Sequence, residues 1–250
     1  MKFQTLASGS KGNCSILLCG NTKILIDAGI SYLNIKKKLL EENLYLNDFS
    51  AILITHAHSD HIKGLENLIK HTLLNVYIPL KMYPDLQEIV PKDRIVNLEE
   101  NTYINDVLIT LIKTSHDAIS VGYLITYLNK SLVYLTDTGY LNRKYFDILK
   151  NKNIYFIESN HDEEMLLNGP YPYFLKQRVI SDRGHLSNNT ASQYLEKLVN
   201  INTKYIFLAH LSATNNTFEK AIDATTNKVD TTNITVFIAK QDEVSELVEV

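Results

Sequence analysis

The segment 54–64, ITHAHSDHIKG, gathers residues that bind metal ions. It places three histidines and one aspartate between His56 and His61, in a chain with eight histidines in all. A packed core would need a hydrogen-bond partner for every ring nitrogen, and a solvated loop needs no such cluster. Imidazole and carboxylate groups are ordinary ligands of zinc and related ions. The segment therefore predicts a metal site, with ligands enough for two ions.

The spacing of these residues indicates how the ligands divide. His56 and His58 lie two positions apart, so in extended backbone their side chains point the same way and can bind one ion together. Asp60 and His61 follow a turn into a helix and can face a second ion. A closed structural site needs only four ligands, whereas the sequence offers seven candidates: His56, His58, Asp60, His61, His116, Asp137 and His210. This surplus predicts two ions, with Asp137 as the bridging carboxylate.

Ionisable residues also stand at the ends of short apolar runs. Asp27 ends TKILID, His116 ends TLIKTSH, Asp137 ends SLVYLTD, Glu158 ends IYFIE and His210 ends KYIFLAH. Strands that end at one rim would hold such side chains on rigid supports. A set of nitrogen and oxygen ligands without cysteine favours zinc, manganese or iron over copper(I).

The elements that must position these residues are short strands and helices in alternation. Strands are predicted at KFQTLA, CSILLC, TKILID, AILIT, NVYIP, VLITLIKTS, SVGYLITYL, SLVYLTD, IYFIES, KYIFLAH and ITVFIA. Helices are predicted at 32–43, 62–71, 143–149, 162–167, 188–199 and 217–225. In the first helix Leu33, Leu39 and Leu40 are expected to face inward. Two β blocks with helices outside predict a four-layer αββα sandwich, an α/β fold in one domain over residues 1–250.

Composition limits the function classes. With 45% hydrophobic and 21% charged residues, the chain has ordinary globular composition. No apolar run approaches the roughly 20 residues needed to span a bilayer, and no signal-peptide pattern opens the sequence. We therefore expect a cytoplasmic protein with no membrane partner and no obligate protein partner. The net charge of −3 does not indicate a nucleic-acid partner, but a local basic groove would suffice for one.

The sequence resembles the metallo-β-lactamase fold superfamily in four features. These are the motif HAHSDH after a strand, then an isolated histidine, then an aspartate at the end of a strand, and a late histidine. ASGSKGN at 7–13, SHDA at 115–118, TDTG at 136–139, ESNHD at 158–162, RGHLSN at 183–188 and AHLSATNN at 209–216 resemble its YycJ/WalJ (VicX-type) branch. The resemblance covers nearly the whole chain. It implies the αββα fold, a two-metal hydrolytic centre and 5′-to-3′ exonuclease activity on DNA.

The resemblance also assigns roles to residues. It implies that His56, His58 and His116 hold the first ion, that Asp60, His61 and His210 hold the second, and that Asp137 is shared. Asp27 would orient a ligand histidine from outside. SHDA replaces the glyoxalase-type motif HTPGH, which counts against thioester or β-lactam substrates. Only twenty residues separate His116 from Asp137, so the arm of transfer-RNA-processing relatives is missing.

The expected chemistry is phosphodiester hydrolysis. Two ions about 3.5–4 Å apart can clamp a phosphodiester and supply a bridging hydroxide as nucleophile. The leaving oxygen still needs a proton, and the resemblance assigns that catalytic role to His185 together with Asp60. We expect His161 to bind phosphate, since a histidine pKa near 6.5 suits both tasks. Alternatively, His185 only precedes a helix that Ser187 caps, and His161 is structural.

Substrate contacts are expected in PYFLKQRVISDRGH, which leads into His185. Its cations could bind DNA phosphates while Tyr171 or Tyr173 stacks on a base. A charge run is often only a solvated face, and an asparagine in a loop often only pins the loop. The substrate-binding candidates are Lys176, Arg178, Arg183 and Asn216.

Three function classes compete. The first is a DNA-acting phosphodiesterase. The second is a small-molecule phosphodiesterase of the same fold. The third is a non-hydrolytic member, either a redox di-iron protein or a regulatory module. The full ligand set counts against a regulator without metal, and the lack of a flavin-binding extension counts against the redox role.

Overall fold

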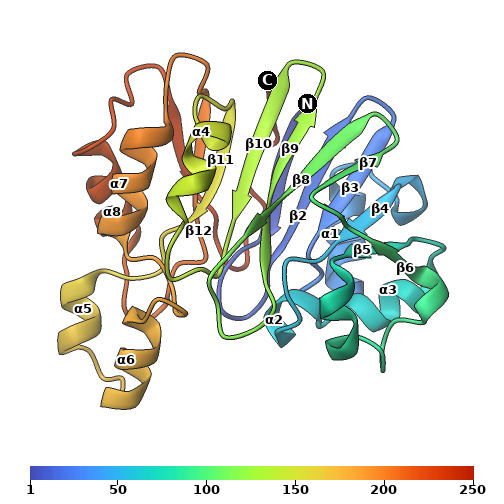
Figure 1. Ribbon diagram of the computed structural model, residues 1–250, viewed down its shortest axis with the longest axis horizontal. Helices are drawn as coiled ribbons and strands as arrows, with labels where there is room; N and C mark the ends of the chain where they lie inside the picture. Colours follow the sequence, from blue (N-terminus) through green and yellow to red (C-terminus); the bar gives the residue numbers. More distant parts are fainter.

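Two seven-stranded sheets pack face to face in the computed structural model, which describes residues 1–250 (Figure 1). The first sheet has the order β14 (Val248–Glu249), β1 (Lys2–Ala7), β2 (Cys14–Cys19), β3 (Thr22–Ile26), β4 (Ala51–Leu53), β5 (Val76–Ile78), β6 (Ile95–Asn97). The second has the order β13 (Thr235–Ile238), β12 (Tyr205–Ala209), β11 (Ile154–Glu158), β10 (Lys130–Leu135), β9 (Val121–Tyr127), β8 (Val107–Lys113), β7 (Asn101–Ile104).

Helices cover the outer faces of both sheets, which confirms the predicted αββα sandwich (Figure 1). The first sheet carries α1 (Tyr32–Glu41), α2 (Ser59–Ile62) and α3 (Leu65–His71), and the second carries α4 (Phe146–Leu149), α7 (Asn188–Leu198) and α8 (Phe218–Thr226). The pair α5 (Glu163–Asn168) and α6 (Tyr173–Ile180) projects from one corner (Figure 1). Short 3-10 turns are η1 (Leu46–Asp48), η2 (Leu80–Asp85), η3 (Lys92–Arg94) and η4 (Arg143–Tyr145).

The strands are apolar because most are covered on both faces, by the opposite sheet and by helices. All five residues of β11, IYFIE, are buried. A cluster of 45 buried residues joins the two sheets. Within it the Phe3 ring meets Phe156 and Phe207 edge-on, at centroid distances of 5.7 and 5.2 Å. No helix is long and apolar enough to cross a membrane.

The helices depart from the predictions in three places. The helix expected at 62–71 begins only at Leu65, as α3, after the short helix α2 that ends at Ile62; between them the N–H of Gly64 donates to the Ala28 carbonyl (2.7 Å). Helix α6 was not predicted at all. The predicted inward set of α1 was partly wrong: Leu33 and Leu40 are exposed, while Leu39 and the unpredicted Ile35 are buried.

Candidate metal centre

The candidate ligands gather at one edge of the sandwich because their strands run in the same direction. Asp27 and His56 follow the parallel strands β3 and β4. Asp137 and His210 follow the strands β10 and β12, which run parallel through β11. Strand β8 is antiparallel to β9, and β9 to β10, so His116 after β8 reaches the same edge.

The backbone is strained where the site residues leave their strands. Asp27, Asp137 and His210 have φ values of 60°, 49° and 54°, in the left-handed region that glycine favours. Such strain is typical of functional sites, where the surrounding structure holds it in place. Close to Asp27, position 29 requires glycine, because a Cβ there would lie 1.7 Å from the Asp60 carbonyl oxygen.

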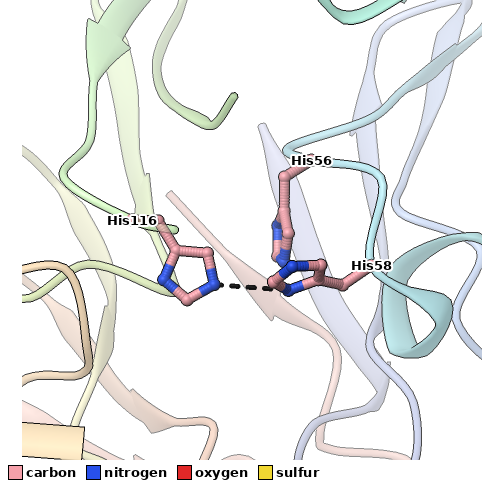
Figure 2. A group of neighbouring side chains, drawn as sticks. All are labelled: His56, His58 and His116. Carbon is pink, nitrogen blue, oxygen red and sulfur yellow. Dashed lines mark hydrogen bonds between the residues drawn. The ribbon is translucent and has the colours of Figure 1, made fainter. Parts of the chain in front are cut away.

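His56, His58 and His116 form the first group. Figure 2 shows His116 reaching from a separate segment toward the other two rings, and ligand nitrogens of all three lie within 4.8 Å of one another. The Nε2 of His116 is 3.3 Å from the Nδ1 of His58. Burial, and after it the neighbouring His61, hold the pKa of His56 well below its usual value, so this ring is neutral. Its buried Nε2 has no hydrogen-bond partner, which leaves a lone pair for an ion.

Asp60, His61 and His210 form the second group, also within 4.8 Å. Nδ1 of His61 donates to Asp27 Oδ2 at 2.9 Å, so its Nε2 faces Asp60 Oδ2 (3.6 Å) and Asp137 Oδ2 (3.2 Å). An outer carboxylate that holds one ring nitrogen fixes the tautomer and orientation of a metal-binding histidine. Asp27 has the predicted contact with a candidate ligand.

Asp137 lies between the two groups. Its Oδ2 faces His61, and its Oδ1 lies 3.4 Å from the Nδ1 of His210. Burial would raise the pKa of Asp137, but His210 and His61 outweigh it and hold the pKa well below its usual value. Burial likewise lowers the pKa of His61, but Asp27 and Asp137 raise it to about 10. These carboxylates favour positive charge in the site, and the buried Nε2 atoms of His56 and His210 have no hydrogen-bond partner. The site therefore fits divalent cations.

Glu158 is a site residue whose role was missed in the sequence. It is fully buried, and its Oε1 accepts from the Nδ1 of His185 (2.7 Å) and the Nδ1 of His210 (2.9 Å). Its Oε2 accepts from the N–H groups of Thr138 and Leu186. Burial raises the pKa of Glu158, but His185 outweighs it and the net value is about 2. One indication of its role was present in the sequence, since Glu158 stands at the end of a strand as the candidate ligands do. Its two histidine partners are distant in sequence, so these contacts could not be predicted.

A cavity of about 240 Å³ opens over these groups. Its wall includes the candidate ligands His58, Asp60, His116, Asp137 and His210, together with His185, Tyr171 and Arg178. The His185 ring lies 5.4 Å from that of His116 and 5.3 Å from that of His210, between centroids. Because its Nδ1 is held by Glu158, its Nε2 is the nitrogen left for a bound substrate.

The profile of the β-lactamase superfamily domain matches residues 22–211. The chain belongs to the metallo-β-lactamase superfamily. It is 37% identical over 227 residues to exodeoxyribonuclease YycJ of Bacillus anthracis, covering 88% of this chain and 86% of the relative. It is 37% identical over 228 residues to exodeoxyribonuclease WalJ of Streptococcus pneumoniae, covering 88% and 85%. The solved structure of the metallo-β-lactamase fold protein YhfI from Bacillus subtilis has a TM-score of 0.74 at 17% identity, covering 98% of this chain and 100% of that one.

These similarities confirm the resemblance that the motifs indicated, including the YycJ/WalJ branch. The metallo-β-lactamase fold implies divalent metal ions, and the histidine and aspartate groups of this chain can bind them.

Two residues that were predicted to contact the substrate, His161 and Asn216, do not line the cavity. His161 is 2% exposed and lies off the cavity wall, and burial lowers its pKa to about 4. This burial counts against a phosphate-binding role and favours the alternative that His161 is structural. The Asn216 amide donates to the Ser159 and Asn160 carbonyls at 2.9 and 3.1 Å. The alternative of a loop-pinning asparagine therefore fits Asn216 better than substrate binding.

The three cations that were predicted to bind the substrate differ in their position relative to the cavity. Only Arg178 lines the cavity, and its Nε and Nη2 both donate to Asp117 Oδ2, at 2.9 and 2.7 Å. Lys176 donates to a backbone carbonyl of α5 and braces the α5–α6 pair. Arg183 is exposed in the turn before His185. The charge of Arg178 is thus already compensated, which weakens the expectation of a direct phosphate contact.

Proposed function

We propose that this protein hydrolyses DNA phosphodiester bonds with two divalent metal ions, as a 5′-to-3′ exonuclease. The observation that carries the proposal is the convergence of the seven predicted ligands into two adjoining groups with Asp137 between them. The names of the relatives YycJ and WalJ, both exodeoxyribonucleases, support DNA as substrate. Zinc or manganese ions, with iron as a third choice, a cytoplasmic location and a single domain over 1–250 belong to the same proposal.

Each ion would be held by the ligands that the family pattern implies. The first would be held by His56, His58 and His116, the second by Asp60, His61 and His210, and both by Asp137. When bound, such ions neutralise charge on the phosphoryl oxygens and lower the pKa of water toward neutrality. Asp27 and Glu158 keep ligand histidines oriented through their Nδ1 atoms.

His185 would give a proton to the leaving oxygen. Burial opposes protonation of His185, but the Glu158 carboxylate outweighs it and raises the pKa of the ring. Its protonated form is therefore retained to higher pH than in an ordinary histidine, as a general acid requires. Asp60 lies on the same cavity wall and would act beside His185.

A small-molecule phosphodiesterase is the second candidate. The cavity of about 240 Å³, below the roughly 300–1,000 Å³ usual for ligand pockets, can enclose only a small diester or the part of a polymer around one bond. A polymer substrate would need further surface outside the cavity.

The test compares substrates on protein reloaded with manganese or zinc. DNA labelled at the 5′ or the 3′ end, single- or double-stranded, is incubated with and without EDTA, beside bis(p-nitrophenyl) phosphate. We expect nucleotides to be released from the 5′ end, EDTA to stop the reaction, Asp137→Asn to lose it and His71→Ala, outside the site, to keep it. Intact DNA under every metal, with the small diester cleaved, would support the second candidate. Cleavage of a thioester alone would contradict phosphodiester hydrolysis.

A further inference from the structure

A second, larger cavity lies beside the metal cavity, on the other side of the loop that carries His116. Its volume is about 770 Å³, and Thr114, Ala118, Ile119 and Ser120 of this loop form one wall. The hydroxyls of Thr114 and Ser120 are hydrogen-bonded at 2.6 Å and close the base of the loop. Thr114 lines this cavity and His116, two residues later, lines the metal cavity, so the two cavities meet at this loop.

The groove, as we call this cavity, also belongs to the edge where the metal ligands lie. Pro79 and Lys81 line it, and they follow β5, which is the parallel neighbour of β4. His56 follows β4 at the same edge. Neighbouring strands are about 4.8 Å apart, so the groove begins next to the first group of ligands.

The groove is basic in a protein that is acidic overall. Lys81, Lys113 and Lys144 line it, all exposed, against the single acid Glu100, while the chain has a net charge of −3. None of the three ammonium groups is in an ion pair; the lysines that form one are Lys2, Lys23, Lys37, Lys70, Lys220 and Lys240. The ammonium of Lys144 lies over the Tyr145 ring, 4.8 Å from its centroid, so a base that stacks on this ring must displace it. Three cations without a carboxylate partner in one concavity are a local field that favours a polyanion.

The floor between these cations is apolar and contains an aromatic ring. Leu111, Ile119, Ile148 and Tyr145 line it, and Ile119 and Ile148 are 43% and 42% exposed. The Tyr145 hydroxyl accepts from the N–H of Lys113 at 3.2 Å, which fixes the ring at one end. Cations along a backbone path, with an aromatic and apolar floor for bases, are the combination that binds single-stranded nucleic acid.

We propose that the groove binds the single-stranded part of a DNA substrate a few nucleotides from the bond that is cleaved, with Lys81, Lys113 and Lys144 on its phosphates and its bases over Tyr145. This inference rests on the proposed function and deepens it. It supplies the surface that the small metal cavity lacks for a polymer.

The experiment measures kcat and KM of the metal-loaded enzyme on thymidine oligonucleotides of two to eight nucleotides and on bis(p-nitrophenyl) phosphate. The variant K81A/K113A/K144A removes the cations, and K81R/K113R/K144R keeps them. The matched control K197A/K204A/K228A removes three exposed lysines; Lys204 directly precedes β12 and so lies at the opposite edge of its sheet.

In the alanine variant we expect the KM of the octanucleotide to rise about tenfold or more, and its salt dependence to fall by about 0.7 per lost phosphate contact, up to about 2. The dinucleotide and the small diester should change less than twofold, and the arginine and control variants should behave as wild type. An octanucleotide KM within twofold of wild type, or an equal loss on long and short substrates, would overturn the groove assignment alone. A wild-type enzyme that cleaves the small diester but no oligonucleotide would overturn the DNA substrate itself, and with it this inference.

Discussion

Replacement of His185 by alanine should separate proton donation from metal binding. The Nδ1 of His185 is bonded to Glu158 Oε1 at 2.7 Å, and the seven candidate ligands make their two groups without it. The variant should therefore keep the metal content of wild type. Loss of a general acid lowers turnover by about 10²–10⁴-fold, which corresponds to about 3–5 kcal/mol of barrier.

The assay compares leaving groups at fixed metal content. A DNA end has a poor leaving oxygen that needs the proton, whereas p-nitrophenolate leaves with little help, so bis(p-nitrophenyl) phosphate should lose far less rate. His71→Ala serves as the matched control, because His71 stacks on Tyr32 outside the site. Loss of an ion in His185→Ala would place His185 among the ligands. Equal slowing on both substrates with metal retained would show that His185 binds phosphate and does not act as the acid.

Two further predictions concern buried partners. Glu158→Gln removes the carboxylate that raises the pKa of His185, so the loss of activity at high pH should move to lower pH; an unchanged pH–rate profile would remove Glu158 from this role. His161 has a folded pKa of about 4 against 6.5, so below pH 6.5 only the unfolded chain takes up its proton, and stability should fall by about 3 kcal/mol between pH 6.5 and 4. In metal-free His161→Gln, denaturant unfolding should show a flatter pH dependence over this range, and the same slope as wild type would refute the account.

The fold, and the gathering of the candidate ligands at one edge, were predictable because both depend on local patterns. Apolar runs such as IYFIE end in ionisable residues, and parallel strands bring those ends to one edge. The pairing of His56 with His58 follows from side-chain alternation alone. His116 and His210 were candidates because each ends an apolar run, and the metallo-β-lactamase resemblance then assigned each of them to one of the two ions.

The rest depended on contacts between distant segments. Glu158 stands 27 residues from His185 and 52 from His210, and no local pattern links them. His161 and Asn216 are polar residues in motif-like segments, and only their burial shows that they serve the interior. Helix α6 has a weak helical pattern, because Tyr173 and Phe174 at its start are exposed aromatic residues. The groove joins lysines from three separate segments, so it has no counterpart in the sequence as a motif.

Metal stoichiometry tests whether each chain binds two ions through Asp137. Protein purified without chelator, or metal-free protein reloaded and desalted, is measured by elemental analysis beside Asp137→Ala and His71→Ala. We predict close to two ions per chain in wild type and His71→Ala, and loss of most of that metal in Asp137→Ala, because Asp137 lies between the two ligand groups. A wild-type content of one ion or none, or two ions retained in Asp137→Ala, would contradict it.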